Sequence, residues 1–488
     1  MKRLFYIMMS VALTMVSCTD DDSFTTSRGS LLTFAKDTLS LDTLFSTVPT
    51  RTFDFWVYNR SGDGLRINQV RLSRGNQTGF RVNVDGLYLD NSTGSQAQGI
   101  EVRKGDSIRV FVELTTKTNG GDTPQLVEDD LLFRLESGAE QKVNLRAWSW
   151  DALLYDSLVV ARDMEITGAK PIVIRQGIRV DSIATLRIKS PATLYFSSTA
   201  GIDVYGSLVV EGEVGDDVVM RGDRLDHMFD YLPYDRVSGQ WRGIHIMPSS
   251  SDNRLKNVDI HSGGNAIVCD SSAYDSTKVR LSLENVTIHN CSGYGLAADH
   301  SNVAIANTLI SNTLGDCLYL RGGSATIDYA TLAQFYPFDA NRGAAVRLAD
   351  CDAHFRNSLV TGYADDVFYA DSLQFTFTHS IVRTDVWGLD SVQIDSHFID
   401  THIETPKDSL NGIMHFPLID IDNLVYDFHP DSLSPAVGNA IPVNRLTTDR
   451  NGMARPAEHP TIGCYEYIPK VTAARRRTTE AIRRQYRR

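Results

Sequence analysis

Asp316, Asp366 and Arg347 are residues of this 488-residue chain whose types suit acid–base chemistry. A pair of carboxyl groups can serve as the acid and the base or nucleophile when a glycosidic bond is cleaved. An arginine can hold a carboxylate or sulfate group of such a substrate. Asp316 lies in the stretch LISNTLGDCLYL (309–320), between two apolar runs that carry no helix signal. Whether the three residues meet depends on the elements that carry them.

The segment around these residues repeats itself every 22 residues. LSLENVTIHNCSGYGLAADHSN (281–302) aligns without gaps with VAIANTLISNTLGDCLYLRGGS (303–324), and the unit 353–374 again has 22 residues. The unit between them, 325–352, has 28 residues because of an insertion around YPFDAN. Three short strands per unit, each pairing with its counterpart about 4.8 Å away in the next unit, predict a right-handed parallel β-helix. A leucine-rich repeat would need a helical stretch in every unit, and the sequence has no such stretch.

The repeat places Asp316 and Asp366 in one column, two coils apart. Their backbones are then roughly 10 Å apart, which is more than the separation in a typical glycosidase pair. That distance is also long for a shared calcium ion. Asp365 could contribute instead, and Asp316 is expected to be exposed at the start of a strand. We predict no cofactor; calcium is the alternative that stays open, although no motif supports it.

The strand after this column is the better candidate for a binding site. Alternation turns Leu318, Val346 and Phe368 inward, and it turns Tyr319, Arg347 and Tyr369 outward on one sheet. Aromatic faces stack on sugar rings, and the arginine could bind a uronate or a sulfate. The insertion FYPFDANRG (335–343) is expected to wall one side of this strip. The alternative stays open that these are ordinary surface residues, which add modest stability through cross-strand pairing.

Other columns have a structural interpretation. One column holds a run of amides at a sharp turn, with Tyr329 in the 28-residue coil and His379 after it; the amides are Asn257, Asn285, Asn307 and Asn357. Stacked amides bond to one another along the helix axis and satisfy polar groups at turns. His261 and His289 form an outward pair, but a metal or base role needs a carboxylate that the sequence does not place. We therefore expect exposed histidines there, and we expect Trp241 to pack over a coil edge.

The rest of the chain divides into further segments. A basic start and an apolar run predict a lipoprotein signal peptide at 1–17, followed by an acidic tether at 18–30. Short strands separated by turns predict a β-sandwich at 31–150. The β-helix is expected at 151–430, a C-terminal cap module at 431–469 and a basic tail at 470–488. Five cysteines at wide spacing after Cys18 fit no disulfide framework and are expected to be buried.

Several motifs carry a resemblance to bacterial surface lipoproteins. Met-Val-Ser-Cys (15–18) resembles a lipobox, which implies acylation of Cys18. GFRVNVDG (79–86) and GDSIRVFVEL (105–114) resemble an Ig-like domain that precedes β-helices in such proteins. SPAVGNA, DRNGMARP and IGCYEY (434–467) resemble the choice-of-anchor-type module that follows them, in which Asp449, Arg455 and Glu466 could form an ion network. The repeats from about 150 to 430 are similar to those of pectin-lyase-like β-helices. The family implies an architecture and no reaction.

Gly315-Asp316-Cys317 also resembles the Gly-Asp-Asp-Cys run of polygalacturonase-type hydrolases. It is one Asp short, and the Gly-His-Gly motif of those enzymes is missing. The expected function is therefore non-catalytic: glycan binding, adhesion or scaffolding by a monomer anchored in the outer membrane and exposed at the cell surface. The alternative is a polysaccharide lyase or glycoside hydrolase that acts on an acidic glycan. A net charge of −12 argues against nucleic acid as a partner.

Overall fold

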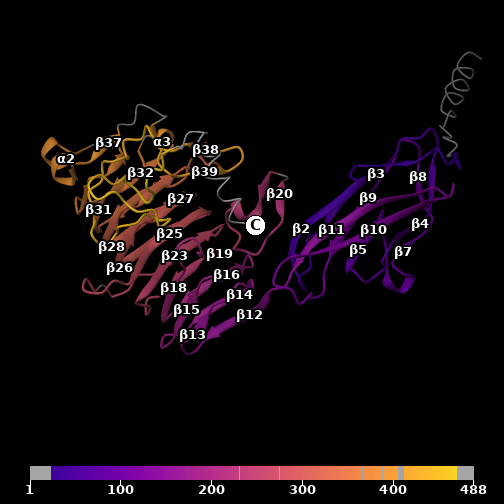
Figure 1. Ribbon diagram of the computed structural model, residues 1–488, viewed down its shortest axis with the longest axis horizontal. Coiled ribbons are helices and arrows are strands. Elements are labelled where there is room, and N and C mark those ends of the chain that lie inside the picture. The colour runs from indigo at the N-terminus through magenta and orange to yellow at the C-terminus, as the bar shows by residue number, and fades with distance from the viewer. Residues whose placement is uncertain are drawn as a thin grey trace, which may run out of the picture. The chain divides into compact units, whose positions relative to one another are not determined.

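The chain forms two compact units that divide after Asp151 (Figure 1). The computed structural model describes residues 23–469 except Asp230, Tyr274, Asp365, Trp387 and 405–410. The signal peptide, Cys18, the rest of the acidic tether up to residue 22, and the basic tail lie outside the described residues. Among the described residues, no helix has the length and apolar character needed to cross a membrane.

The N-terminal unit consists of two sheets that share one core. All strand pairs are antiparallel except β11 with β2, which run parallel. Alternating side chains such as Ile108, Val110 and Val112 are buried between the sheets. The first sheet has the order β1 (Leu32–Phe34), β3 (Phe53–Asn59), β9 (Ser107–Leu114), β5 (Phe80–Val84), β6 (Leu87–Tyr88). The second has the order β2 (Thr38–Phe45), β11 (Glu140–Trp150), β10 (Gln125–Leu135), β4 (Leu65–Leu72), β7 (Gln96–Ala97), with β8 (Ile100–Val102) also on β4; a short helix, η1, spans Asn91–Thr93.

The second unit is a parallel β-helix, which confirms the predicted fold class. In the part of the chain that the structure describes, one sheet of 24 strands follows the chain order, and Figure 1 labels many of its strands from β12 to β37. They are β12 (Leu153–Val160), β13 (Met164–Ile166), β14 (Ile172–Val180), β15 (Thr185–Lys189), β16 (Thr193–Phe196), β17 (Ile202–Val204), β18 (Ser207–Glu211), β19 (Val218–Gly222), β22 (Ile244–Ile246), β23 (Asn253–His261), β24 (Ile267–Cys269), β25 (Leu281–Cys291), β26 (Leu296–Ala306), β27 (Leu309–Thr313), β28 (Leu318–Asp328), β29 (Thr331–Gln334), β30 (Val346–Ala349), β31 (Asp352–Arg356), β32 (Leu359–Gly362), β33 (Phe368–Ala370), β34 (Phe375–Thr378), β35 (Ile381–Arg383), β36 (Phe398–Ile399) and β37 (His402–Glu404).

The strands line up in three faces. The first face runs through β15, β18, β31 and β34. The second face runs through β16, β19, β27, β29 and β32, and includes the ends of β23 and β25. The third face runs through β17, β22, β24, β30 and β33, and includes the starts of β26 and β28. Apolar side chains from all three faces fill the interior.

Asparagines build the corner between the first and second faces. Asn285 Nδ2 donates to Asn257 Oδ1 (3.0 Å), and Asn307 Nδ2 donates to Asn285 Oδ1 (3.1 Å). The column has left-handed backbone throughout, with φ of 50°, 56° and 46° at these three positions and 53° at Tyr329. Asparagine tolerates this conformation better than most residues do. His379 also has positive φ (48°), so its interpretation as a turn residue is confirmed.

The C-terminal module packs along the flank of the β-helix. Thr448 O accepts from Asn307 Nδ2, Ile441 O accepts from Asn357 Nδ2, and Cys464 N donates to Thr331 Oγ1. These contacts of the predicted cap module spread over several coils of the second face. The corner amides and the outer surface of this face therefore bind the module. The helix α3 (Asn411–Met414) and the strands β38 (Leu418–Asp420) and β39 (Val425–Asp427) precede this module in the chain, and the helix α2 (Ser391–His397) lies between β35 and β36. The short helix η2 (Tyr234–Arg236) and the hairpin of β20 (His227–Phe229) and β21 (Leu232–Pro233) precede β22.

Two further predictions about buried residues are confirmed. The five described cysteines are unpaired and buried: Cys269, Cys291, Cys317, Cys351 and Cys464. Trp241 is only 1% exposed and stacks on Phe196 at 4.5 Å, while its Nε1 donates to the backbone oxygen of His261. These residues contribute to packing.

Candidate functional site

Tyr319, Arg347 and Tyr369 form an outward row on the third face. They pair in register on consecutive strands, Tyr319 on β28 with Arg347 on β30, and Arg347 with Tyr369 on β33. Their inward neighbours, including Leu318 and Val346, are buried, as alternation requires. The β-helix thus brings together side chains that are up to 50 residues apart in sequence.

The row borders a cavity of about 430 Å³. Its polar lining includes Tyr319, Arg347, Asp366, Tyr369 and Thr384. The remainder is mainly apolar, and the larger apolar residues are Leu348, Phe368, Leu373, Phe375, Val386, Leu389 and Phe398. A concave, mostly apolar pocket with a few polar groups at its rim is the usual form of a small-ligand site.

Arg347 is held by two neighbours from adjacent coils. Its Nε donates to Asp316 Oδ2 (3.0 Å), and its guanidinium carbon lies 4.9 Å from the centre of the Tyr369 ring. The Tyr319 ring in turn stacks on Tyr294, with ring centres 5.6 Å apart. These contacts fix the orientation of the row before any ligand arrives.

Asp316 is buried, so the prediction of an exposed residue is wrong. It is 5% exposed, because its two carboxylate oxygens accept hydrogen bonds from the Ala344 N–H (2.6 Å) and from Arg347 Nε. Asp316 is not among the residues that line the cavity. Its role here is to orient Arg347 and to tie two coils together.

Asp366 lies in the cavity and is partly buried. Burial raises the pKa of its carboxyl, and the hydrogen bonds from the Phe368 N–H and from Thr384 only partly oppose that shift. The second carboxyl of the lining, Asp371, accepts a hydrogen bond from the Asp350 N–H (2.7 Å). Asp365 lies outside the described residues. Within the described lining, Asp366 is therefore the carboxyl group whose pKa is raised by burial.

The insertion 335–343 does not line this cavity, contrary to expectation. Phe335 is fully buried and packs against Phe416 and Phe428, on the flank that the C-terminal module covers. Phe335 belongs to the apolar cluster there, whereas Phe338 is 61% exposed. The cavity is walled instead by Thr384, Val386, Gly388 and Leu389, which come after the last 22-residue unit and so were not reached by the repeat analysis.

Comparison with known proteins supports the architecture. Residues 156–332 match the family model described as a right handed beta helix region. The matched segment includes Tyr319 and ends before Arg347. No curated protein matches the chain.

The chain is also similar to a solved structure, the crystal structure of a protein of unknown function from Porphyromonas gingivalis W83. The identity is 13%, over 27% of this chain and 59% of that chain, with a TM-score of 0.18. The aligned part thus spans well under two thirds of that protein's length.

Proposed function

We propose that this protein binds a glycan, without cleaving it, through Tyr319, Arg347, Tyr369 and the cavity that they border. The observation that carries the proposal is the placement of two tyrosines and an arginine in register at the rim of one cavity. Right-handed β-helix domains are common in carbohydrate-active and carbohydrate-binding proteins. Tyrosine rings offer apolar faces to sugar C–H groups and a hydroxyl for hydrogen bonding.

The charge of the site favours a neutral sugar over an acidic one. Arg347 already faces the carboxylate of Asp316, so the pair carries no net charge. Asp366 adds a carboxyl group that would repel an anionic ligand when it is ionised. The guanidinium then serves as a donor to sugar hydroxyls, in place of the uronate or sulfate contact that the sequence suggested.

We further propose that acylation of Cys18 anchors the protein in the outer membrane, with the β-helix exposed at the cell surface. More than one acyl chain on Cys18 would make the anchor durable. The N-terminal unit, Ig-like in this proposal, acts as a spacer. A Cys18→Ser variant is then expected in the soluble fraction, and protease added to intact cells is expected to digest the wild-type protein. Protection of the wild type in intact cells would contradict surface exposure.

A glycan array tests the binding proposal. Wild type is expected to bind a restricted set of glycans, and Tyr319→Ala and Tyr369→Ala are each expected to reduce the signal on that set. Tyr231→Ala is the matched control, since Tyr231 is 55% exposed in the same unit and does not line the cavity. Equal signals from all four proteins would remove the row from consideration.

The alternative function, a polysaccharide lyase or glycoside hydrolase acting on an acidic glycan, rests on Asp366. A carboxyl whose pKa is raised by burial, in a cavity that an arginine also lines, has the properties of a general acid. Incubation of the array-selected glycan with wild type and Asp366→Asn distinguishes the two functions. New reducing ends or unsaturated products from wild type alone would favour the enzyme; an intact glycan favours binding.

A further inference from the structure

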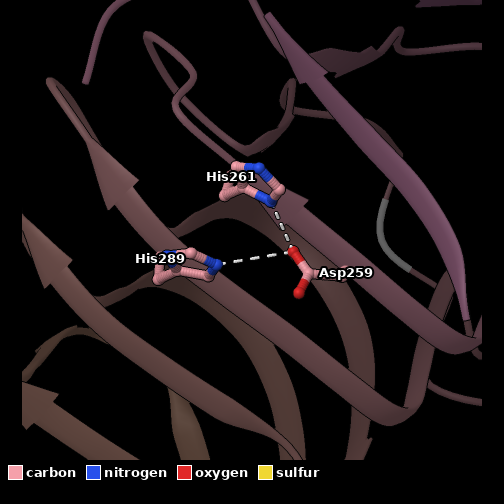
Figure 2. A group of neighbouring side chains, drawn as sticks. All are labelled: Asp259, His261 and His289. Atoms are coloured by element: carbon pink, nitrogen blue, oxygen red, sulfur yellow. Dashed lines mark hydrogen bonds and ion pairs between the residues drawn. The ribbon is translucent and has the colours of Figure 1, made fainter. Parts of the chain in front are cut away.

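Asp259, His261 and His289 form a cluster on the outer side of the second face (Figure 2). Asp259 and His261 stand two residues apart on β23, and His289 stands beside His261 on β25. Both histidines point a ring nitrogen at the same carboxylate oxygen, Asp259 Oδ1. The distances are 2.6 Å from His261 Nδ1 and 3.4 Å from His289 Nε2. The carboxylate that the sequence could not place is therefore supplied by the strand of His261 itself.

The cluster is not a surface feature, although exposed histidines were expected here. His261 is 8% exposed, and the rings of His261 and His289 stack with centres 4.8 Å apart. The C-terminal module covers this part of the face: Arg450 Nε donates to Thr287 Oγ1. One buried imidazole lies beside a second imidazole and a carboxylate that are each partly exposed, with 27% of the His289 side chain and 28% of the Asp259 side chain accessible. Burial of such polar groups is costly unless they have partners.

A second observation points to a ligand beside the cluster. His289 borders a cavity of about 330 Å³ between β25, β27 and residues 424–429, with Tyr465 of the C-terminal module also in its lining. Ser311, which pairs with His289 in register, and Asn312 also line it. Among the described residues, neither Ser311 Oγ nor Asn312 Oδ1 has a hydrogen-bond partner, although both atoms are buried. Buried polar atoms without partners are uncommon and indicate a missing water, ion or ligand.

The surrounding charges permit a cation. Two arginines interact electrostatically with the cluster, and each is already paired with an acid of its own. Arg221 Nη1 lies 3.6 Å from Asp235 Oδ2, and Arg450 Nη2 lies 2.7 Å from Asp217 Oδ2. The Asp259 carboxylate is thus left to neutralise the histidine cluster or an ion held by it.

We propose that Asp259, His261 and His289 bind a divalent transition-metal ion of the zinc class, reached through the cavity that His289 borders. Zinc–ligand distances of about 2.1 Å place tetrahedral ligand atoms about 3.4 Å apart. The three ligand atoms here lie within 4.8 Å of one another, so small side-chain rotations suffice to close on an ion. Imidazole nitrogen selects zinc, copper, nickel or iron, whereas calcium prefers oxygen ligands alone. Three protein ligands leave a coordination position for water or for a small ligand in the cavity.

Metal titration of the full chain tests this site. The protein is stripped with a chelator, and Zn²⁺ and Co²⁺ are then added separately, with binding followed by calorimetry and by the visible spectrum of Co²⁺. Wild type is expected to bind one equivalent of either ion. His289→Gln and Asp259→Asn are each expected to lower affinity by more than the roughly 10- to 100-fold that loss of a hydrogen-bond partner of a ligand costs.

His245→Gln is the matched control. His245 Nε2 lies 2.8 Å from Asp270 Oδ1 on the third face, so it is a histidine–carboxylate pair without the second histidine. This variant is expected to bind metal as wild type does. No binding by wild type, or equal binding by all four proteins, would overturn the proposal and leave a hydrogen-bonded histidine pair.

Two measurements keep folding and function apart. Circular dichroism before titration shows whether His289→Gln and Asp259→Asn are folded, and loss of the Co²⁺ spectrum in a folded variant supports the site. Glycan binding is measured in parallel. Because the cluster lies on the second face and the tyrosine row on the third, glycan binding is expected to persist in the metal-site variants. This inference therefore stands or falls independently of the proposed function.

Discussion

At the scale of single residues, the corner asparagines provide a direct test of the fold. Asn307 has φ of 46°, donates to Asn285 and Thr448, and is 1% exposed. Asn307→Ala keeps the β-carbon in the left-handed region, which alanine tolerates less well than asparagine does, and it leaves these buried partners without their hydrogen bonds. We therefore expect it to lower the free energy of unfolding by about 2–4 kcal/mol. Asn307→Gly relieves the backbone strain and is expected to cost about 1 kcal/mol less. Denaturant unfolding measures both.

Asn302→Ala is the control for this pair, since the Asn302 amide makes an exposed hydrogen bond to Ser276. Its expected cost is below about 1 kcal/mol. If Asn307→Ala costs no more than Asn302→Ala, the corner column does not contribute to stability in the way described.

Asp366 gives a prediction about pH. Its pKa lies above 3.8 in the folded protein because of burial. The native carboxyl therefore keeps its proton over a pH range in which the unfolded chain has already lost it. The stability that this group contributes is fully present below pH 3.8 and falls as pH rises through the native pKa. Asp366→Asn cannot ionise, so its stability relative to wild type is expected to rise over that window. If the difference in free energy of unfolding between wild type and Asp366→Asn stays constant from about pH 4 to about pH 7, that result would be evidence against a raised pKa.

The sequence predicts the direction of a side chain correctly where the length of the repeat and the alternation along a strand determine that direction. The outward direction of Tyr319 and Arg347 follows from a 22-residue repeat and the two-residue alternation of strands. The burial of Asp316 did not follow, because its hydrogen bonds come from the Ala344 N–H and from Arg347 one coil later. Nor was Asp259 recognised, since it is one of many acids until the neighbouring strand sets His289 beside it.

At the scale of elements, the C-terminal module depends on a buried ion pair. Arg455 Nη1 lies 2.7 Å from Glu466 Oε1, with side chains 3% and 5% exposed, and the Arg455 guanidinium lies over the Tyr329 ring. The predicted link to Asp449 is indirect: its carboxylate accepts the Glu466 N–H (2.8 Å). Arg455→Met leaves Glu466 buried without its partner, so we expect a loss of about 3–5 kcal/mol.

Lys256→Met is the control for the ion pair, because the pair of Lys256 and Glu284 is about half exposed. Removing it is expected to cost at most about 1 kcal/mol. Limited proteolysis adds a local readout: cleavage within 431–469 is expected to accelerate in Arg455→Met and not in the control. Equal cleavage rates would show that other contacts hold the module.

The same module shows what a repeat cannot reveal. The sequence motifs predicted that the module exists. Its position on the second face depends on the buried amides of Asn307 and Asn357 and on an apolar patch that includes Leu309 and Phe335. Those partners come from separate coils. Only the folded β-helix puts them on one surface.

At the scale of the whole molecule, the two units have separate hydrophobic cores. The tyrosine row, its cavity and every described residue that lines it belong to the second unit. A chain that lacks residues 23–151 is therefore expected to bind glycan with unchanged affinity, provided that circular dichroism shows a folded β-helix. An affinity lower by tenfold or more, which is about 1.4 kcal/mol, would mean that the N-terminal unit contributes to recognition.

The central claim is that the tyrosine row binds a glycan. Isothermal titration of the array-selected glycan into wild type, the double variant Tyr319→Ala/Tyr369→Ala and Tyr231→Ala tests it most directly. Each aromatic contact contributes about 0.5–1.5 kcal/mol, so the double variant is expected to bind at least about 5-fold more weakly while Tyr231→Ala binds as wild type does. Wild-type affinity in the double variant, or no glycan bound by wild type, would contradict the claim.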